Sequence, residues 1–434
     1  MHRMLCPVET LYVGQRSRGV ISSALRGHLD VAALSAAFDA VTQAHPSLRS
    51  RIVPEGEGFA LQLLAEAERP RLATRTGDTD AAHAAELNMA LPVGGPLSRA
   101  VLVSAPRGDD YLFVLSVDHT IADGHSSIAL HHEVWNRYRA LVEGVGSKTK
   151  LFSVADGTLD WPAPVSGLLP AADSARTADY LELRIEETLR RPAQMIAYDV
   201  ADPSAVEGRI EVCRVALDEE RTSRLRHCAR AVGVSVHAVI AAALLATARR
   251  RLHGDEPLPL SCLSPVDLRS RLSPPVPALV MIPAVTAHLQ TLDVTPGAEL
   301  GDLACTIHAR LSDFVTGEGP YHEMRIMPEV PRSPTLQLAT VIVTNMGVVP
   351  EPRMPEGLEI TDARLVPARE RYFPQAERSP VMACVVSFEG RLTIEFPYFT
   401  ACFSPAFVQA LGDEVRAALI AFTEGIGPAC PSTD

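Results

Sequence analysis

One histidine and one aspartate follow an apolar run at a point where the chain turns. Residues 111–117, Tyr-Leu-Phe-Val-Leu-Ser-Val, read as a strand, and Asp-His-Thr-Ile-Ala-Asp-Gly at 118–124 follows directly. A loop at the end of a rigid strand can present a side chain to a cleft, and Gly124 permits backbone angles that other residues avoid. A neutral imidazole can remove the proton of a nearby hydroxyl group. His119 is therefore the predicted general base.

Two other chemistries fit the same segment less well. His119, Asp123 and His125 carry metal-ligating atoms, but no fourth ligand clusters nearby, so we expect no metal site. Residues 124–128, Gly-His-Ser-Ser-Ile, resemble the G-x-S-x-G turn of hydrolases. Ile128 stands where that turn needs a second small residue, which argues against a serine nucleophile.

The composition describes a large, acidic, globular chain. Its 434 residues are 47% hydrophobic and carry a formal net charge of -12, which disfavours nucleic acid as a partner. The eight cysteines form no C-x-x-C pair, so neither a zinc knuckle nor a disulfide framework is expected. The first twenty residues lack the apolar core of a secretion signal, and the longest apolar run, 238–246, is too short to span a bilayer. We expect a cytoplasmic protein.

The hydrophobic pattern predicts an α/β protein with two similar-sized halves. Residues 1–160 form the expected N-terminal subdomain, 161–205 a Pro- and Ala-rich crossover linker, and 206–434 the C-terminal subdomain. His131 and His132 are expected on the solvated face of a helix. Helices are expected at 31–45, 126–142, 219–232, 236–252 and 404–423, and strands at 47–53, 99–103, 111–117, 209–216, 258–263, 280–289, 338–344 and 381–396.

Several short motifs, in this order, resemble the CoA-dependent acyltransferase superfamily. That superfamily includes chloramphenicol acetyltransferase, the plant hydroxyl acyltransferases and the condensation domains of peptide synthetases. The Pro-Val-Asp-Leu-Arg segment and the length are most similar to the polyketide-associated acyltransferases of the phthiocerol dimycocerosyl transferase type. The motifs are Gly27-His28-Leu29-Asp30, His45-Pro46-Ser47-Leu48-Arg49, Pro96-Leu97, His119 to Gly124, Gly233 to Val239, Pro265-Val266-Asp267-Leu268-Arg269 and Val343-Thr344-Asn345-Met346-Gly347.

The resemblance implies a fold and an activity. The fold would be two chloramphenicol-acetyltransferase-like α/β sandwich subdomains that form a pseudo-dimer with the active-site tunnel between them. The activity would be O-acyl transfer from a thioester, either acyl-CoA or an acyl carrier protein of a polyketide synthase. The acceptor would be a hydroxyl of a lipid diol or of another natural product. We expect a monomer without a bound cofactor or a covalent enzyme intermediate, and the resemblance is compatible with peripheral membrane contact.

The resemblance also assigns roles to residues around His119. It implies that Asp123 turns away from the substrate and pairs with an arginine, for which Arg269 is the candidate. The backbone near Gly124 and the side chain of Asn345 are candidate oxyanion donors. Two arginines of expected helices in the second half, Arg230 and Arg310, are candidates for docking a carrier protein.

One departure from the superfamily pattern keeps other functions open. Many members carry two adjacent histidines before the three-residue spacer, and this chain has Asp118 in place of the first. Neighbouring residues of a strand face opposite ways, so Asp118 is expected to point away from the His119 side. A condensation-like module that binds an acyl carrier protein without catalysis is the alternative function, and a thioester hydrolase is a second one.

Overall fold

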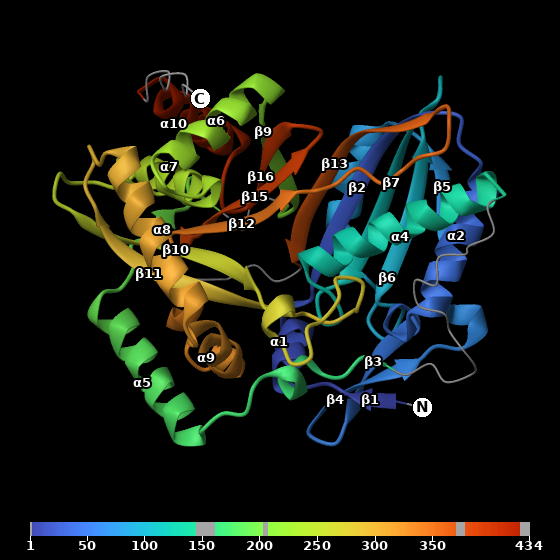
Figure 1. The fold of residues 1–434 in the computed structure, drawn as a ribbon, viewed down its shortest axis with the longest axis horizontal. Coiled ribbons are helices and arrows are strands. Elements are labelled where there is room, and N and C mark those ends of the chain that lie inside the picture. Colours follow the sequence, from blue (N-terminus) through green and yellow to red (C-terminus); the bar gives the residue numbers. More distant parts are fainter. Residues whose placement is uncertain (1, 145–160, 203–206, 370–377, 426–434) are drawn as a thin grey trace, which may run out of the picture. The chain divides into compact units, whose positions relative to one another are not determined.

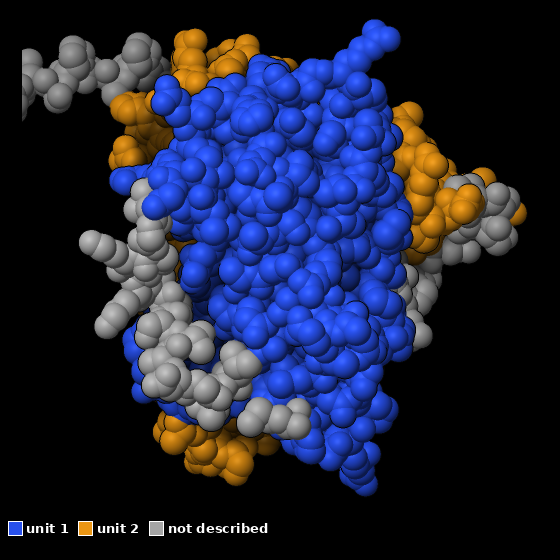
Figure 2. All heavy atoms as spheres, turned by 90° about the vertical axis from the view of Figure 1, so that its right-hand side faces the viewer, with its two compact units in different colours: residues 1–170, 267–285, 349–371 blue, residues 171–266, 286–348, 372–434 orange. Residues whose placement is uncertain are grey.

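The computed structural model describes residues 2–144, 161–202, 207–369 and 378–425. The chain divides into two compact units, which Figure 2 colours separately. Unit 1 comprises residues 1–170, 267–285 and 349–371, and unit 2 comprises residues 171–266, 286–348 and 372–434. Each unit has its own β-sheet and helices, so the predicted α/β class with two sheet-based subdomains is confirmed.

A five-stranded sheet forms the centre of unit 1, with strand β2 paired on both sides (Figure 1). Only the β5–β6 pair is parallel. The strand order is β13 (Leu358–Arg369), β2 (Ser17–Gly27), β7 (Asp110–Asp118), β6 (Ser98–Ser104) and β5 (Leu72–Thr76). Strand β13 pairs with β2 along its length, from Leu358 beside Gly27 to Arg369 beside Ser17, and so brings a late segment into the N-terminal sheet.

Helices cover both faces of this sheet. Alternate residues of a strand face opposite ways. Gly19 of β2 faces Ser127 of α4 (Gly124–Val142), and the preceding residue, Arg18, donates to the carbonyl of Leu87 in α3 (Thr79–Asn88). Helices α3 and α4 therefore lie on opposite faces. The other elements of unit 1 are α1 (Pro7–Gln15), α2 (Val31–Ala44), which packs on α4, and a small sheet of β1 (His2–Met4), β4 (Gly58–Leu63) and β3 (Ser50–Glu55).

Unit 2 is built on a six-stranded mixed sheet. Its core helix, α7 (Val236–Arg250), is rich in alanine and almost wholly buried, which lets α8 (Leu300–Thr316) and α10 (Pro405–Gly425) pack against it. The strand order is β11 (Val285–Val294), β10 (Leu258–Asp267), β12 (Val341–Val348), β15 (Val381–Phe388), β16 (Arg391–Phe399) and β9 (Ile210–Leu217). The remaining elements are α5 (Ser174–Arg190), α6 (Glu219–Ala231), α9 (Gly319–Ile326) and the short pair β8 (Ile196–Ala197) and β14 (Arg378–Ser379).

The structure corrects several expected elements. Strands β2 and β13 were not expected, and the expected strand at 47–53 begins only at Ser50, after a short 3-10 helix, Pro46–Arg49. Much of the expected linker is helix α5, whose Arg184 is buried against Glu323. The unit bounds differ from 1–160, 161–205 and 206–434 because β13 completes the N-terminal sheet. Residues 145–160 and 203–206 lie outside the described residues.

His131 corrects a further expectation, since it is buried and not solvated. The indole Nε1 of Trp135 donates to His131 Nε2 at 3.0 Å, and Ser23 Oγ lies 3.0 Å from the same nitrogen. An indole can only donate, so Nε2 is the acceptor and the imidazole is neutral with its proton on Nδ1. His131 therefore belongs to the core between β2 and α4.

Acid should destabilise the fold through His131. Burial lowers the pKa of His131 from 6.5 to about 3, with His132 adding to the effect. The unfolded chain binds this proton first, so the stabilisation is complete above pH 6.5 and is lost as the pH falls toward 3. At pH 5 the loss is about 2 kcal/mol. We expect His131→Gln to flatten the pH dependence of the unfolding free energy in denaturant titrations, whereas His125→Gln, at an exposed position, should leave it unchanged; equal slopes would contradict this assignment.

Among the described residues, no single helix is long and apolar enough to cross a membrane, and one bent pair, α6 with α7, meets the length and composition criteria together at an angle of 97°. The seven cysteines within the described residues are all free thiols, and Cys430 lies outside them.

Candidate functional site

The segment that carries His119 is fixed at both ends by hydrogen bonds. At the end of β7, Asp118 Oδ1 accepts from the backbone N–H of Thr120 at 2.8 Å. At the start of α4, Asp123 is the N-cap, and its Oδ1 accepts from the backbone N–H of Ser126 at 2.8 Å. Gly124 is the first helical residue, so the prediction that it needs unusual backbone angles is wrong. The turn is made instead by Asp123, which caps the helix.

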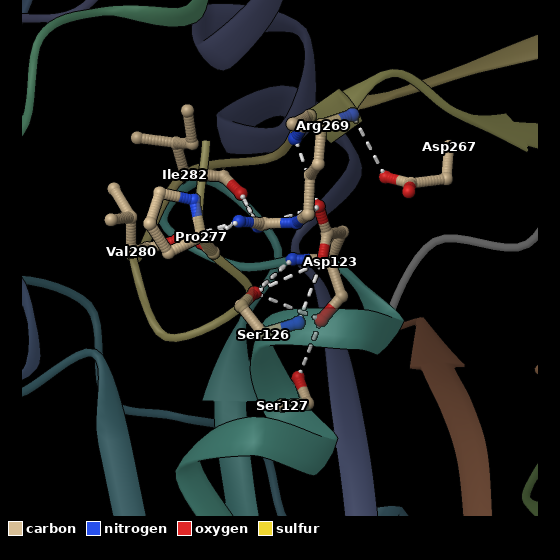
Figure 3. Close-up of polar contacts among 9 residues, drawn as sticks. Asp123, Ser126, Ser127, Asp267, Arg269, Pro277, Val280 and Ile282 are labelled. Carbon is tan, nitrogen blue, oxygen red and sulfur yellow. Dashed lines mark hydrogen bonds and ion pairs between the residues drawn. The ribbon is translucent and has the colours of Figure 1, made fainter. Parts of the chain in front are cut away.

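Asp123 and Arg269 form the predicted ion pair, and both are 4% exposed (Figure 3). Arg269 donates to Asp123 Oδ2 from Nε at 3.1 Å and from Nη2 at 2.8 Å. The remaining guanidinium N–H groups donate to the backbone carbonyls of Pro277, Val280 and Ile282 at 2.8–3.1 Å. All five donors of Arg269 therefore have acceptors, which is the condition for burying this charge at little cost.

The carboxylate of Asp123 is equally occupied. Its Oδ2 also accepts from the backbone N–H of Ala284 at 3.0 Å, and its Oδ1 accepts from Ser126 Oγ at 3.0 Å. No lone pair is left in a position to act on a substrate. Asp123 therefore joins the first turn of α4 to residues 267–285. This is the structural role that the resemblance implied for Asp123.

His119 is held in a different way. Its backbone N–H donates to the carbonyl of Ser17 at 2.9 Å, and its ring lies flat on the ring of Tyr12, with centroids 4.2 Å apart and planes 6° from parallel. The imidazole Nδ1 is buried, and hydrogen bonding with the backbone of His119 itself and of Ala122 acts on the ring.

The surroundings of His119 favour its neutral form. Burial lowers the pKa of His119 below 6.5, and the positive charge of Arg369 adds to this effect. Hydrogen bonds with the backbone of His119 and Ala122 and the negative charge of Asp123 oppose it. Arg369 ends β13, beside Ser17 in the sheet. A histidine that is neutral at physiological pH can accept a proton, which is the property that a general base needs.

The low pKa of His119 predicts the acid limb of the pH–rate profile. Because only the neutral imidazole accepts a proton, kcat/KM should stay constant as the pH falls to 6.5 and should decline only at lower pH. The measurement is kcat/KM of the wild-type protein from about pH 5 to 8, with circular dichroism at each pH to verify folding. An acid limb centred above pH 6.5 would contradict the burial of His119 as the controlling factor.

Asp118 lies on another side of the loop from His119. It pairs in the sheet with Arg18, and neighbouring residues on paired strands share a face. Burial raises the pKa of Asp118, and the positive charges of Arg16 and Arg18 oppose that rise. These three residues line a cavity of about 180 Å³ in unit 1. Arg16 and Arg18 therefore supply the balancing charge for Asp118.

The other predicted site residues belong to unit 2. The Oδ1 of Asn345 in β12 accepts from the backbone N–H of Gly347 at 2.8 Å. Arg230 is exposed on α6, and Arg310 on α8 donates to the carbonyl of Thr291 at 2.8 Å. Arg310 also lines a cavity of about 540 Å³ within unit 2. Their oxyanion and docking roles stay predictions.

Two residues near His119 escaped the sequence analysis. Tyr12 contacts the imidazole directly, and Arg369 acts on it through its charge. Neither residue belongs to a sequence motif. Each is brought to the site by long-range strand pairing, which local patterns do not reveal. Within the described part of the chain, no group of three or more His, Cys, Asp or Glu side chains is arranged to hold a metal ion.

The fold and the His119–Asp123 loop define a class of protein, the condensation-like α/β proteins. The structure of polyketide synthase associated protein 5 from Mycobacterium tuberculosis superposes with a TM-score of 0.72, at 23% identity, over 98% of this chain and 99% of that chain. The epimerization domain of tyrocidine synthetase B superposes with a TM-score of 0.71, at 16% identity, over 98% of this chain and 97% of that chain. This structural similarity establishes the fold, but it does not identify the reaction.

The sequence comparisons give the family. Residues 20–255 match the Condensation domain, so the chain belongs to the Condensation domain family. Residues 206–397 match the "Phthiocerol/phthiodiolone dimycocerosyl transferase C-terminus". A phthiocerol/phthiodiolone dimycocerosyl transferase from Mycobacterium leprae is 27% identical over 388 residues, which cover 86% of each chain. The resemblance drawn from the motifs is thereby confirmed.

Proposed function

We propose that this protein is an O-acyltransferase that moves an acyl group from a thioester to a hydroxyl, with His119 as the general base. The observation that carries the proposal is a half-buried imidazole whose Nδ1 is enclosed, whose pKa is lowered by burial, and whose loop is fixed by Asp123 and Arg269. Its similarity to dimycocerosyl transferases supports acyl transfer over other condensation-family reactions.

The proposed reaction needs one base and no covalent enzyme intermediate. His119 Nε2 takes the proton of the acceptor hydroxyl while the oxygen attacks the thioester carbonyl. The tetrahedral intermediate carries a negative oxygen, for which Asn345 and the backbone near Gly124 are the proposed donors. The intermediate collapses to an ester, and the imidazolium returns the proton to the departing thiolate.

The proposed donor is acyl-CoA or an acyl carrier protein, and the proposed acceptor is a lipid diol or a polyketide hydroxyl. The name of the relative, phthiocerol/phthiodiolone dimycocerosyl transferase, supports a lipid diol acceptor. The name polyketide synthase associated protein 5 supports a polyketide synthase as the partner that supplies substrate. We further propose a cytoplasmic protein that works without a bound cofactor.

The test is thiol release from short- and long-chain acyl-CoA, with and without an added alcohol, followed by mass spectrometry of the products. Release that requires the alcohol and yields its ester supports the proposal. Release without alcohol identifies a thioester hydrolase instead. If no CoA ester reacts, acyl carrier proteins replace CoA in the assay. Binding of the carrier without ester formation would overturn the proposal in favour of the non-catalytic module.

A further inference from the structure

Unit 2 contains a cavity of about 540 Å³ whose wall includes neither His119 nor Asn345. Helices α5 and α8 and strand β11, which can be followed at the left of Figure 1, form most of this wall, and Glu323 of α9 completes it. The volume lies within the roughly 300 to 1,000 Å³ that small-molecule sites occupy. We call this site the α5 cavity.

Arg184 brings an unused hydrogen-bond donor to the α5 cavity. Its side chain is buried, with Nε donating to Glu323 Oε1 at 2.6 Å and Nη1 donating to Glu187 Oε2 at 2.7 Å. Its Nη2 is also buried, but it has no hydrogen-bond partner among the described residues. A buried donor without an acceptor destabilises a protein, so a ligand oxygen at Nη2 would bind favourably.

Strand β11 adds two more unpaired groups to the same wall. His288 and Gln290 are alternate residues of the strand and therefore share a face. The Nε2 of Gln290 donates to the carbonyl of Ile307 at 3.5 Å, so its Oε1 is an acceptor. Neither this oxygen nor His288 Nε2, both buried, has a partner in the described part of the chain.

His288 is a neutral neighbour of Arg184. Burial lowers the pKa of His288 to about 4, and the positive charges of Arg184 and Arg310 add to this effect. A neutral imidazole can carry its proton on Nε2, where it donates. Arg184 Nη2 and His288 Nε2 can therefore donate to the two oxygens of one carboxylate.

The charges of the wall favour a ligand with a single negative charge. Arg184 lies between two carboxylates, and Arg190 and Arg191 form ion pairs with acids outside the wall. The remaining arginine, Arg310, is offset by Asp313 on the same helix. A wall with so little net charge suits a carboxylate better than a phosphate dianion, which would bring unpaired charge.

Two side chains of the wall suit an aliphatic group. Leu183 of α5 is 51% exposed, and Phe314 of α8 stacks on His288 with ring centroids 4.3 Å apart. A ligand with an aliphatic chain would cover both side chains while its polar end meets the unpaired groups.

We propose that the α5 cavity binds a hydroxy acid with a short aliphatic chain. The carboxylate accepts from Arg184 Nη2 and His288 Nε2, and the hydroxyl donates to Gln290 Oε1. The chain packs on Leu183 and Phe314. This site lies within unit 2, and the inference does not depend on the proposed acyl transfer.

The test is calorimetric titration of the full chain with 3-hydroxyoctanoate, octanoate and 1,3-octanediol. The hydroxy acid should bind most tightly. Octanoate, which lacks the hydroxyl, and the diol, which lacks the carboxylate, should each bind about tenfold more weakly or worse, because each leaves a buried group unpaired. The NMR signals of the His288 ring, assigned with His288→Gln, should shift when the hydroxy acid is added at neutral pH.

Two variants locate the binding. Gln290→Met keeps the volume but removes the acceptor, so 3-hydroxyoctanoate and octanoate should bind it equally. Arg184→Lys keeps a positive charge beside Glu323 but removes Nη2, so both acids should bind about tenfold more weakly or worse. The matched controls, Gln409→Met and Arg332→Lys, change exposed residues of unit 2 outside the cavity and should bind as the wild type does.

Three results would overturn the inference. The first is neither heat nor a His288 shift with 3-hydroxyoctanoate. The second is equal affinity of the wild type for 3-hydroxyoctanoate and octanoate. The third is binding that neither variant alters, which would place the ligand elsewhere. Should circular dichroism show that Arg184→Lys does not fold, Gln290→Met decides alone, and an unchanged preference for the hydroxy acid in that variant would reject the site.

Discussion

Replacing His119 by alanine is expected to lower the rate of acyl transfer by about 10² to 10⁴-fold while the protein stays folded. The alanine removes the proton acceptor but retains the side chains of Asp118 and Asp123, which hydrogen-bond to the backbone at the two ends of the turn. The His119 backbone N–H, which binds the Ser17 carbonyl, is also retained. The loss should therefore appear in kcat, measured as ester formed from acyl-CoA and alcohol.

The control for this experiment is His125→Ala. His125 is the exposed residue next to Gly124 on α4, so its loss removes a nearby imidazole without altering His119. We expect this variant to match the wild type in rate and in thermal stability. Turnover within about threefold of wild type in His119→Ala would show that the reaction uses another base or none.

Replacing Asp123 by alanine is expected to destabilise the protein by about 3 to 5 kcal/mol. The substitution leaves the Arg269 guanidinium buried with two of its donor directions unpaired, and it removes the cap of α4 and the acceptor of the Ala284 N–H. Urea unfolding measures the loss. Activity should fall with it, because α4 and the loop that carries His119 begin at this residue.

An exposed ion pair of the same unit gives the matched control. Arg26 and Asp110 are 3.0 Å apart, with side chains 66% and 55% exposed. Solvent screens such a pair, so Asp110→Ala should cost no more than about 1 kcal/mol. An Asp123→Ala protein that is as stable as the wild type but inactive would reverse the assignment, since Asp123 would then act in the chemistry.

The parts of the fold that local patterns encode were predictable. Helix α2 begins at the expected cap, Asp30, and ends before Pro46, and the hairpin of β15 and β16 turns at Glu389 and Gly390, both with positive φ. In each case the signal lies within a few residues of the element that it specifies.

Strands β2 and β13 were missed for a physical reason. Strand β2 contains three serines and two glycines, which have weak strand propensity, and its conformation is imposed by neighbours on both sides. A Cβ on Gly19 would lie 3.2 Å from Ser127 Oγ, so a small residue there lets α4 approach. No local pattern records that requirement.

The residues of the candidate site also fall into two groups: those that local motifs predict and those that only long-range pairing brings to the site. The pairing of Asp123 with Arg269 followed from motif resemblance, because both residues stand in recognisable segments. Tyr12 lies in no motif, and only the register of β2 against β7 brings it to His119. The burial of His131 was missed because its partners, Ser23 and Trp135, lie on a strand that was not expected and one turn further along the same helix.

The late arrival of β13 in the N-terminal sheet has a consequence for biosynthesis. Strand β2 leaves the ribosome early, yet its partner on one side is residues 358–369, and the acceptor groups of Arg269 come from residues 277–282. The surroundings of His119 can therefore assemble only when most of the chain has been translated. Until then β2 exposes an unpaired edge, which makes the nascent chain a natural client for chaperones that shield open strands.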